Sequence, residues 1–396
     1  MKDKRMKAYV YTEKGIIQKK ELPVPELNEG KNPEDSFAAV LRPLFLSPCS
    51  SDVHTVYAGK GPSRDNLVLG HEGIAQIVKT GSMVRDFRPG DVVAVSPVMP
   101  EVEDGTGHEN AHFSGMKLGR AWDGEWAEFF KIPDADMNLA FIPEGLSMEA
   151  ALMAVDVMST GFTAALQSGI EKGDDVTVIG SGAIGLMAAA AARELGAGNI
   201  FMIGTGRSEK NVKLAGEYGV NCYIDYHTGD ILYASEEIKS RAAEQTDEEV
   251  YASKGNAYDD PSVDRLLRLT GGNGTARVLI CGGDRRSVGR ACDMVRYGDG
   301  VVINMNYIEG EGDIPLPVFS LGRGMAGKTF KFMLSRGGRH YLEKMLLRAK
   351  NGRPDPAPLV THRLEGFDSI PEALELMRRR PEGLIKIMIE VQEWKK

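Results

Sequence analysis

The chain has 396 residues, of which 42% are hydrophobic and 26% are charged, and its formal net charge is -8. This length corresponds to two or three domains of about 100 to 200 residues each, and the balanced composition excludes a disordered or collagen-like chain. The negative charge argues against a general nucleic-acid-binding protein.

No segment has the pattern of a membrane span or a targeting signal. The longest weakly polar run covers residues 182–192, well short of the roughly 20 residues that a membrane helix needs. Residues 1–5 carry several charges and no apolar stretch follows them. We therefore expect no signal peptide, no membrane association and a cytoplasmic location.

The first part of the chain is predicted to be rich in β-structure. Short runs of β-forming residues up to about residue 140 are separated by Gly and Pro turns. These runs are residues 7–11, 37–46, 74–79 and 91–96. A helical spacing of apolar residues follows at 147–166.

From residue 174 onward, predicted strands alternate with helices, which indicates a parallel α/β sheet. The expected elements are strands at 175–179, 199–203, 277–280 and 300–305 and a helix at 184–195. The chain then ends in a predicted helix at 371–379 and a strand at 383–391.

Residues 230–260 interrupt this alternation with many acidic and few basic residues and no sustained core pattern. We interpret this segment as a solvated helical excursion from the sheet domain. A subunit contact or a cover over a cofactor site is the alternative.

A GxGxxG motif lies directly after one predicted strand and opens the next helix. Its first glycine permits a tight turn, the second lets the backbone approach a pyrophosphate, and the third allows the helix to pack closely on the strand. The phosphates would lie at the helix N-terminus, where unpaired N–H groups favour anions. The predicted dinucleotide-binding residues are Gly180, Gly182, Ala183, Ile184 and Gly185.

The end of the next strand favours NADP over NAD. An NAD site usually has an acidic residue there, which bonds the ribose 2'-hydroxyl. This chain has Gly204, Thr205 and Arg207 instead, so a hydroxyl and a guanidinium are available to hold a 2'-phosphate. Glu209 lies near enough in the sequence to keep NAD as the alternative.

Cys49, His71 and Glu72 are candidate zinc ligands. A thiolate, an imidazole and a carboxylate from separate loops can supply the protein ligands of a catalytic zinc and leave one position for substrate. Each residue alone is more often structural, but their coexistence with a dinucleotide motif favours an oxidoreductase.

These residues carry a resemblance to a known family. The chain resembles the zinc-dependent medium-chain alcohol dehydrogenases and looks most like the bacterial NADP-dependent secondary-alcohol dehydrogenases. The similarity covers nearly the whole length and is carried by residues 47–56, 69–72, 134–140, 156–162, 180–187 and 360–387.

The resemblance implies an α/β fold with a Rossmann doubly wound parallel sheet and a β-rich GroES-like catalytic domain. The expected domains are the catalytic domain at 1–162, the Rossmann domain at 163–318 and a C-terminal segment at 319–396 that returns to the catalytic domain. By analogy with the family, we expect a homotetramer.

Residue by residue, the resemblance implies one catalytic zinc, bound by Cys49, His71 and Asp156. Glu72 is the carboxylate that such enzymes can exchange onto the metal, and Asp156 stands where many relatives have a second cysteine. A second, structural zinc is not expected, because residues 96–117 contain no cysteine.

The same resemblance implies further roles near the metal and the cofactor. Asp52 would orient the imidazole of His71. Ser51 and His54 match a proton relay, in which the serine hydroxyl bonds the alcohol oxygen and passes its proton toward the histidine. The positions expected around the adenosine 2'-phosphate are Gly204, Thr205, Arg207 and Tyr226, with one extra residue between Gly204 and Arg207.

The sequence thus predicts a zinc-dependent enzyme that interconverts a secondary alcohol and its ketone by hydride transfer with NADP or, less favoured, NAD. Apolar residues near the expected pocket favour a bulky apolar substrate; they are Phe113, Met116, Trp122 and Trp126. The alternatives are a polyol or sugar dehydrogenase of the same superfamily and a catalytically silent nucleotide-binding relative.

Overall fold

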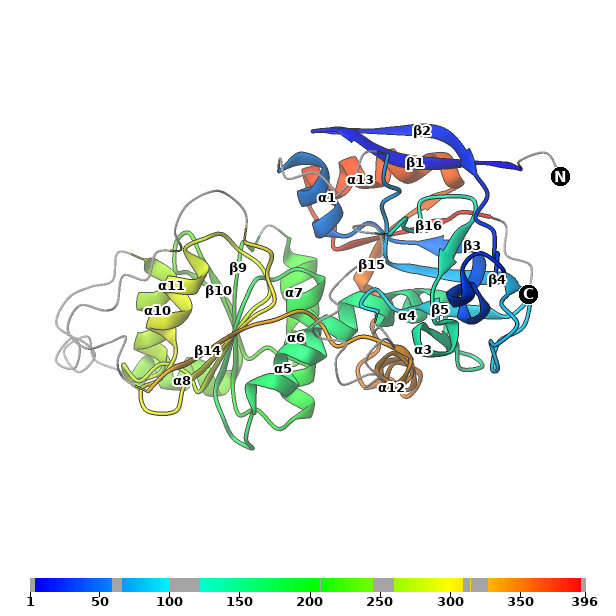
Figure 1. Ribbon diagram of the computed structural model, residues 1–396. Helices are drawn as coiled ribbons and strands as arrows, with labels where there is room; N and C mark the ends of the chain where they lie inside the picture. The colour runs from blue at the N-terminus through cyan, green and yellow to red at the C-terminus, as the bar shows by residue number, and fades with distance from the viewer. Residues whose placement is uncertain are drawn as a thin grey trace. The chain divides into compact units, whose positions relative to one another are not determined.

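The computed structural model describes residues 4–58, 66–99, 122–206, 208–244, 260–308, 314 and 327–392. The chain divides into two compact units, one of Met1–Ser159 with Leu334–Lys396 and one of Thr160–Met333. Each unit is built around its own sheet (Figure 1). The first unit is therefore made from both ends of the chain and the second from its middle.

The main sheet of the first unit has the described strands in the order β15-β16-β3-β4-β5-β7, with β6 paired to β3. The strands are β3 (Ala39–Leu46), β4 (Gly73–Thr80), β5 (Val92–Val95), β6 (Phe130–Ile132), β7 (Leu139–Phe141), β15 (Val360–Glu365) and β16 (Lys386–Glu390). A separate antiparallel pair consists of β1 (Arg5–Glu13) and β2 (Ile16–Pro23). Ile389 of β16 pairs with Leu46 of β3, so C-terminal residues complete a sheet that N-terminal residues begin.

Helices pack on this sheet through apolar faces. They are α1 (Ser50–Tyr57), α3 (Ala135–Asn138), α4 (Met148–Met153), α12 (Arg339–Lys350) and α13 (Ile370–Arg379), with short 3-10 turns η1 (Pro33–Phe37), η5 (Ala357–Leu359) and η6 (Phe367–Ser369). α13 buries Ile370, Ala373, Leu374 and Met377, spaced three or four residues apart, in a core that includes Trp126. Figure 1 shows α13 beside α1, and the two helices are in contact.

The run from residue 148 to 168 is helical but changes its winding in the middle. α4 begins after the N-cap Ser147, whose hydroxyl accepts the N–H of Ala150. A π-helical turn, η3 (Ala154–Met158), follows and leads into α5 (Ser159–Ser168). Among the described residues this run alone is long and apolar enough to cross a membrane, but 89% of its most apolar window is buried inside the molecule, as in a core helix.

The second unit is a doubly wound sheet with the described strand order β11-β10-β9-β8-β12-β13-β14. The parallel strands are β8 (Val176–Ile179), β9 (Ile200–Gly204), β10 (Cys222–Asp225), β12 (Arg277–Ile280), β13 (Val301–Asn304) and β14 (Thr329–Phe332). β11 (Ile231–Ala234) adds an antiparallel edge. The winding reverses between β8 and β12, the kind of switch point at which ligands bind to such sheets.

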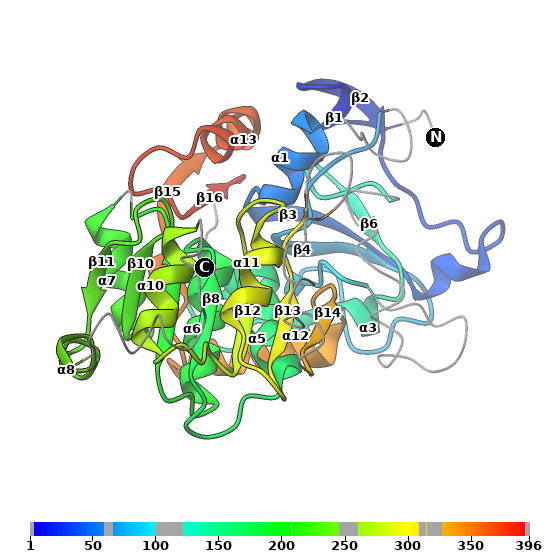
Figure 2. The same cartoon turned by 90° about the vertical axis from the view of Figure 1, so that its left-hand side faces the viewer.

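Helices cover both faces of this second sheet. α6 (Ala183–Glu194) and α7 (Glu209–Glu217) lie on one face, and α10 (Pro261–Leu269) and α11 (Ser287–Met294) lie on the other, in front of the strands in Figure 2. Burial on both faces agrees with strands that read as continuous apolar runs rather than as alternating ones.

The unit boundaries differ from the expected ones. The expected boundary at 162/163 lies at 159/160, and the one at 318/319 lies at 333/334. The second difference arises because Thr329 of β14 pairs in parallel with Val301 of β13, which extends the sheet of the second unit.

The acidic segment is only partly the helical excursion expected from its composition. It begins with the edge strand β11, which the sequence pattern did not predict, and continues into α8 (Glu236–Glu244). Ile238 of α8 is fully buried in the core of the second unit. Residues 245–259 lie outside the described residues.

Candidate active site

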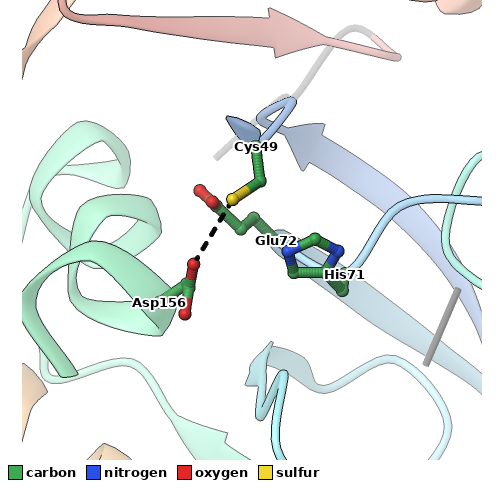
Figure 3. A group of neighbouring side chains, drawn as sticks. All are labelled: Cys49, His71, Glu72 and Asp156. Carbon is green, nitrogen blue, oxygen red and sulfur yellow. Dashed lines mark hydrogen bonds between the residues drawn. The ribbon is translucent and has the colours of Figure 1, made fainter. Parts of the chain in front are cut away.

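Four side chains with metal-binding atoms meet in the first unit. Cys49 precedes α1, His71 and Glu72 precede β4, and Asp156 lies in η3. Their ligand atoms all lie within 4.8 Å of one another, and all four residues are buried (Figure 3). One thiol, one imidazole and two carboxylates form a donor set suited to a catalytic zinc, so the residues present fit this metal.

Asp52 ties two of these four residues together. Its Oδ2 accepts the backbone N–H of Cys49 at 2.9 Å, as part of a capping box at the start of α1. Its Oδ1 lies 3.4 Å from Nδ1 of His71. This carboxylate therefore holds the backbone at Cys49 and orients the imidazole of His71, whose Nε2 is left on the other side of the ring.

The charges of this group are strongly coupled. Burial acts to raise the pKa of Asp52, but the adjoining His71 and the Cys49 N–H outweigh it and lower that pKa. Burial acts to lower the pKa of His71, but Asp52 outweighs it and raises that pKa well above its ordinary value. Burial, followed by the charge of Glu72, raises the pKa of the Cys49 thiol. Since zinc binds a thiolate, metal binding here would release a proton.

Asp156 approaches the group from the π-helical turn. Its Oδ2 lies 3.8 Å from Sγ of Cys49 (Figure 3). Every residue of η3 is buried, so this turn delivers a carboxylate from a helix that is otherwise apolar. Turns of this kind are frequent at functional sites, because the extra residue redirects side chains around the helix.

Lys386 is a site residue that the sequence did not reveal. Its ammonium donates to Oε1 of Glu72 at 2.8 Å and to the carbonyl oxygen of Pro48 at 2.9 Å. Burial raises the pKa of Glu72 to about 7, although Lys386 acts in the opposite direction. Burial alone would lower the pKa of Lys386, but Glu72 and the other acidic groups raise it. Lys386 therefore counteracts the effect of burial and favours the charged carboxylate of Glu72.

The two expected relay residues lie three positions apart on α1, which places them as neighbours on its surface. The hydroxyl of Ser51 lies 3.3 Å from Nε2 of His71. Ser51 and His54 are both half-buried. The structure thus brings Ser51 to the ligand group, with His54 one turn further along the helix.

A second residue that the sequence did not reveal is Glu125. It is completely buried, and neither carboxylate oxygen has a hydrogen-bond partner within the described structure. A Cβ at Gly73 would lie only 2.1 Å from its Oε2, so the carboxyl packs directly under the strand that follows His71 and Glu72. Burial raises the pKa of Glu125 to about 8, despite an opposing effect of His71.

The aromatic residues expected near the pocket occupy different places. Trp126 is only 1% exposed and packs in the core, where a Cβ at Gly70 would lie 2.2 Å from its ring. Trp122 is partly buried against a second core cluster. Phe113 and Met116 lie outside the described residues. Trp126 is therefore a core residue and does not support a bulky apolar substrate.

The dinucleotide motif lies in the second unit, between β8 and α6. Gly180 has φ +104°, a conformation that favours glycine, and a Cβ there would lie 2.7 Å from the nitrogen of Gly282. Gly182 is the N-cap of α6 and has open space where a Cβ would stand. A Cβ at Gly185 would lie 1.9 Å from the oxygen of Gly180, which explains why the third glycine is needed.

The residues expected around the adenosine follow the next two strands. Gly204 ends β9 and Thr205 follows it. Tyr226 comes directly after β10, and its N–H donates to the carbonyl oxygen of Gly204 at 3.0 Å. Arg207 lies outside the described residues.

Comparisons with known proteins agree with this fold and donor set. Residues 38–144 match the family model of the alcohol dehydrogenase GroES-like domain. The chain is 39% identical to an NADP-dependent isopropanol dehydrogenase of Clostridium beijerinckii, over 89% of this chain and 93% of the relative. It is 37% identical to an NADP-dependent isopropanol dehydrogenase of Thermoanaerobacter brockii, over 89% and 92%. An alcohol dehydrogenase from Thermus sp. ATN1 has the same fold, with a TM-score of 0.75 and 26% identity over 98% of this chain and 100% of that one.

Fold, donor set and relatives together define a zinc-type dehydrogenase. The chain belongs to the zinc-dependent medium-chain alcohol dehydrogenase family, and it is an oxidoreductase. The resemblance and the fold class inferred from the sequence, a Rossmann sheet with a GroES-like domain, are confirmed.

Proposed function

We propose that this protein is a zinc- and NADP-dependent dehydrogenase that interconverts a secondary alcohol and its ketone. The observation that carries the proposal is the buried group of Cys49, His71, Glu72 and Asp156. Two relatives that align over 89% of the chain are named NADP-dependent isopropanol dehydrogenases, which supports a small secondary alcohol as substrate.

Cys49, His71 and Asp156 would bind the zinc, with Glu72 as an exchangeable fourth carboxylate. When bound, zinc acts as a Lewis acid that lowers the pKa of an alcohol and polarises a ketone. Asp52 keeps the His71 ring in place, and Lys386 balances the charge of Glu72.

The protein's own residues would then manage the proton. A bound nicotinamide cofactor would supply the hydride acceptor, or the hydride donor in the reverse reaction. The hydroxyl of Ser51 would accept the proton of the alcohol oxygen and pass a proton on toward His54. In the reverse direction the same residues return the proton to the oxygen of the new alcohol. His54 would thus act as general base in oxidation and general acid in reduction.

NADP is the proposed cofactor because no acidic side chain directly follows β9, where an NAD site usually has one. The alternative is a polyol dehydrogenase, which shares the Cys, His and Glu pattern but needs several polar partners for its substrate. The homotetramer and the cytoplasmic location stay predictions.

Three measurements on purified protein test the proposal. Metal analysis should find one zinc per chain, and a panel of ketones of increasing size should be reduced with NADPH in preference to NADH, as followed by nicotinamide absorbance. Greater activity on polyols than on simple secondary alcohols would favour the alternative. Absence of any reduction by zinc-loaded protein would refute the proposal.

A further inference from the structure

The side chain of Tyr223 reaches from β10 past the end of β9 toward the turn that follows β8. Tyr223 lies on β10 and is only 1% exposed. Its hydroxyl accepts the backbone N–H of Gly206 at 3.4 Å, and the hydroxyl of Ser181 lies close to it, on the other side of the position that a Cβ on Gly204 would take. One buried hydroxyl therefore touches both the turn after β8 and the turn after β9.

This crossing is possible because Gly204 has no side chain. A Cβ on Gly204 would lie 2.3 Å from the oxygen of Tyr223 and 2.4 Å from Oγ of Ser181. The strand β9 lies between β8 and β10, so any larger residue at this position would block the path between the two hydroxyls.

Gly206 is also closely packed against its neighbours. Its φ is +54°, and a Cβ there would lie 2.1 Å from Cδ1 of Leu232 and 3.3 Å from Oδ2 of Asp225. Leu232 belongs to β11, the added edge strand. The residue that makes this turn longer than the family pattern is thus held by a hydroxyl from β10 and an aliphatic side chain from β11.

We propose that Tyr223 is a positioning residue that sets the preference for NADP over NAD by fixing the turn of Gly204, Thr205 and Gly206. This inference rests on the proposed use of NADP. The turn carries the groups expected at the 2'-phosphate, whereas Ser181 belongs to the turn expected at the pyrophosphate, which both cofactors share. Because the Tyr223 hydroxyl is bonded to one turn and packs beside the other, it fixes the distance between the two phosphate positions.

The selectivity follows from that distance. The protein binds a 2'-phosphate tightly only if its hydrogen-bond donors lie at the right distance from the pyrophosphate site, because charge-assisted hydrogen bonds depend steeply on geometry. The free 2'-hydroxyl of NAD makes weaker bonds and loses less when the turn shifts. Loss of the Tyr223 hydroxyl should therefore weaken NADPH more than NADH.

The test is Tyr223→Phe, which removes one oxygen and leaves the buried ring. With one ketone at saturation, we expect the KM for NADPH to rise about three- to tenfold, as for one lost hydrogen bond. The KM for NADH should change less than twofold, and kcat with saturating NADPH should be preserved. Ser181→Ala, which removes the other hydroxyl, should shift the two KM values in the same direction.

Tyr233→Phe is the matched control, because this tyrosine lies on the adjacent strand β11 and is 38% exposed. It should leave both KM values unchanged. If Tyr223→Phe changes the KM values for NADPH and NADH by the same factor, or changes neither, the inference is overturned. Wild-type activity with NADPH would still uphold the proposed function in that case. If wild-type protein does not use NADPH, the proposed cofactor itself is wrong. Should Tyr223→Phe fold poorly, the NADPH-to-NADH ratio of Ser181→Ala decides the question.

Discussion

The ammonium of Lys386 lies 2.7 Å from Oε2 of Glu72 in a place where neither side chain is more than 4% exposed. The two residues are 314 positions apart in the chain. A buried ion pair of this kind adds little net stability, but loss of one partner leaves the other charge without compensation.

Lys386→Met should therefore destabilise the first unit strongly. The expected loss in the free energy of unfolding is about 3 to 5 kcal/mol, as for other broken buried pairs. Urea unfolding of the zinc-loaded protein, followed by tryptophan fluorescence, measures it. The control is Lys131→Met. The side chain of Lys131 is 37% exposed and lies 2.9 Å from Asp35. Loss of this partly exposed pair should lower the free energy of unfolding by about 1 kcal/mol or less. Equal losses in the two variants would contradict the importance of burial.

Glu125 should make the stability of the first unit depend on pH. Burial raises its pKa to about 8 from the ordinary value of 4.5, so between these pH values the folded protein binds more protons than the unfolded chain. The free energy of unfolding should consequently fall as pH rises through this window, with a limit of about 1.4 kcal/mol per pKa unit.

Glu125→Gln should remove this part of the pH dependence. Urea midpoints measured across the window, as differences from wild type, isolate the contribution of the one group. Glu382→Gln, at an exposed position, is the control and should follow the wild-type curve. A Glu125→Gln variant that keeps the full wild-type slope would show that the carboxyl is not the buried acid responsible.

Loss of Cys49 or Asp156 should reduce the zinc content. Cys49→Ser removes the thiol ligand and Asp156→Ala removes a carboxylate ligand. Both variants should hold much less than one zinc per chain after dialysis against a weak chelator. In the wild-type protein, X-ray absorption should show a Zn–S distance of about 2.3 Å and a Zn–N distance of about 2.1 Å. Cys292→Ala, which changes a buried cysteine of the second unit, should keep its zinc. Full metal content and activity in Cys49→Ser would disprove the assignment.

His54→Ala should slow catalysis without loss of metal. We expect turnover at neutral pH to fall roughly 10- to 1000-fold, overlapping the range for general acid–base groups. Zinc content and melting temperature should stay near wild type. If turnover per folded molecule is preserved while stability drops, His54 merely packs beneath its loop.

Arg207→Ala should weaken NADPH binding by roughly ten- to a hundredfold and NADH binding little, because a hydrogen bond to a charged group contributes about 1.5 to 3 kcal/mol. Fluorescence titration of both reduced cofactors measures the two affinities directly. Equal loss for both, or a wild-type preference for NADH, would overturn the NADP assignment and leave the dehydrogenase assignment intact.

Local patterns predicted the elements whose signals are local. The strand before Gly180 and the helix after it are recognisable because apolar residues and glycines stand in register over a short stretch, and β8 and α6 lie where that pattern puts them. The candidate ligands Cys49 and His71 could be named from residue types, but Asp156 required the family resemblance, because a lone aspartate in an apolar helix has no spacing signal.

What the sequence could not show depends on contacts between distant residues. Lys386 stands in a strand with no local sign that it faces an acid 314 positions earlier. Glu125 follows an Asp-Gly pair and reads as a solvated turn residue, yet it is fully buried because the turn packs under Gly73. The strand β11 has only four residues, exposes Leu232 and lies in an acidic segment. Its pattern is therefore too short to be recognised as a strand.

The pairing of β16 with β3 also sets the order of events during synthesis. Cys49 and Glu72 leave the ribosome long before Lys386, and the whole second unit is translated in between. Since nascent domains fold as units in the order of their appearance, the nucleotide-binding unit can mature while the first unit still lacks its closing strand. The metal site is therefore the last part of the enzyme to form, because Glu72 has no access to the ammonium of Lys386 until translation is almost complete.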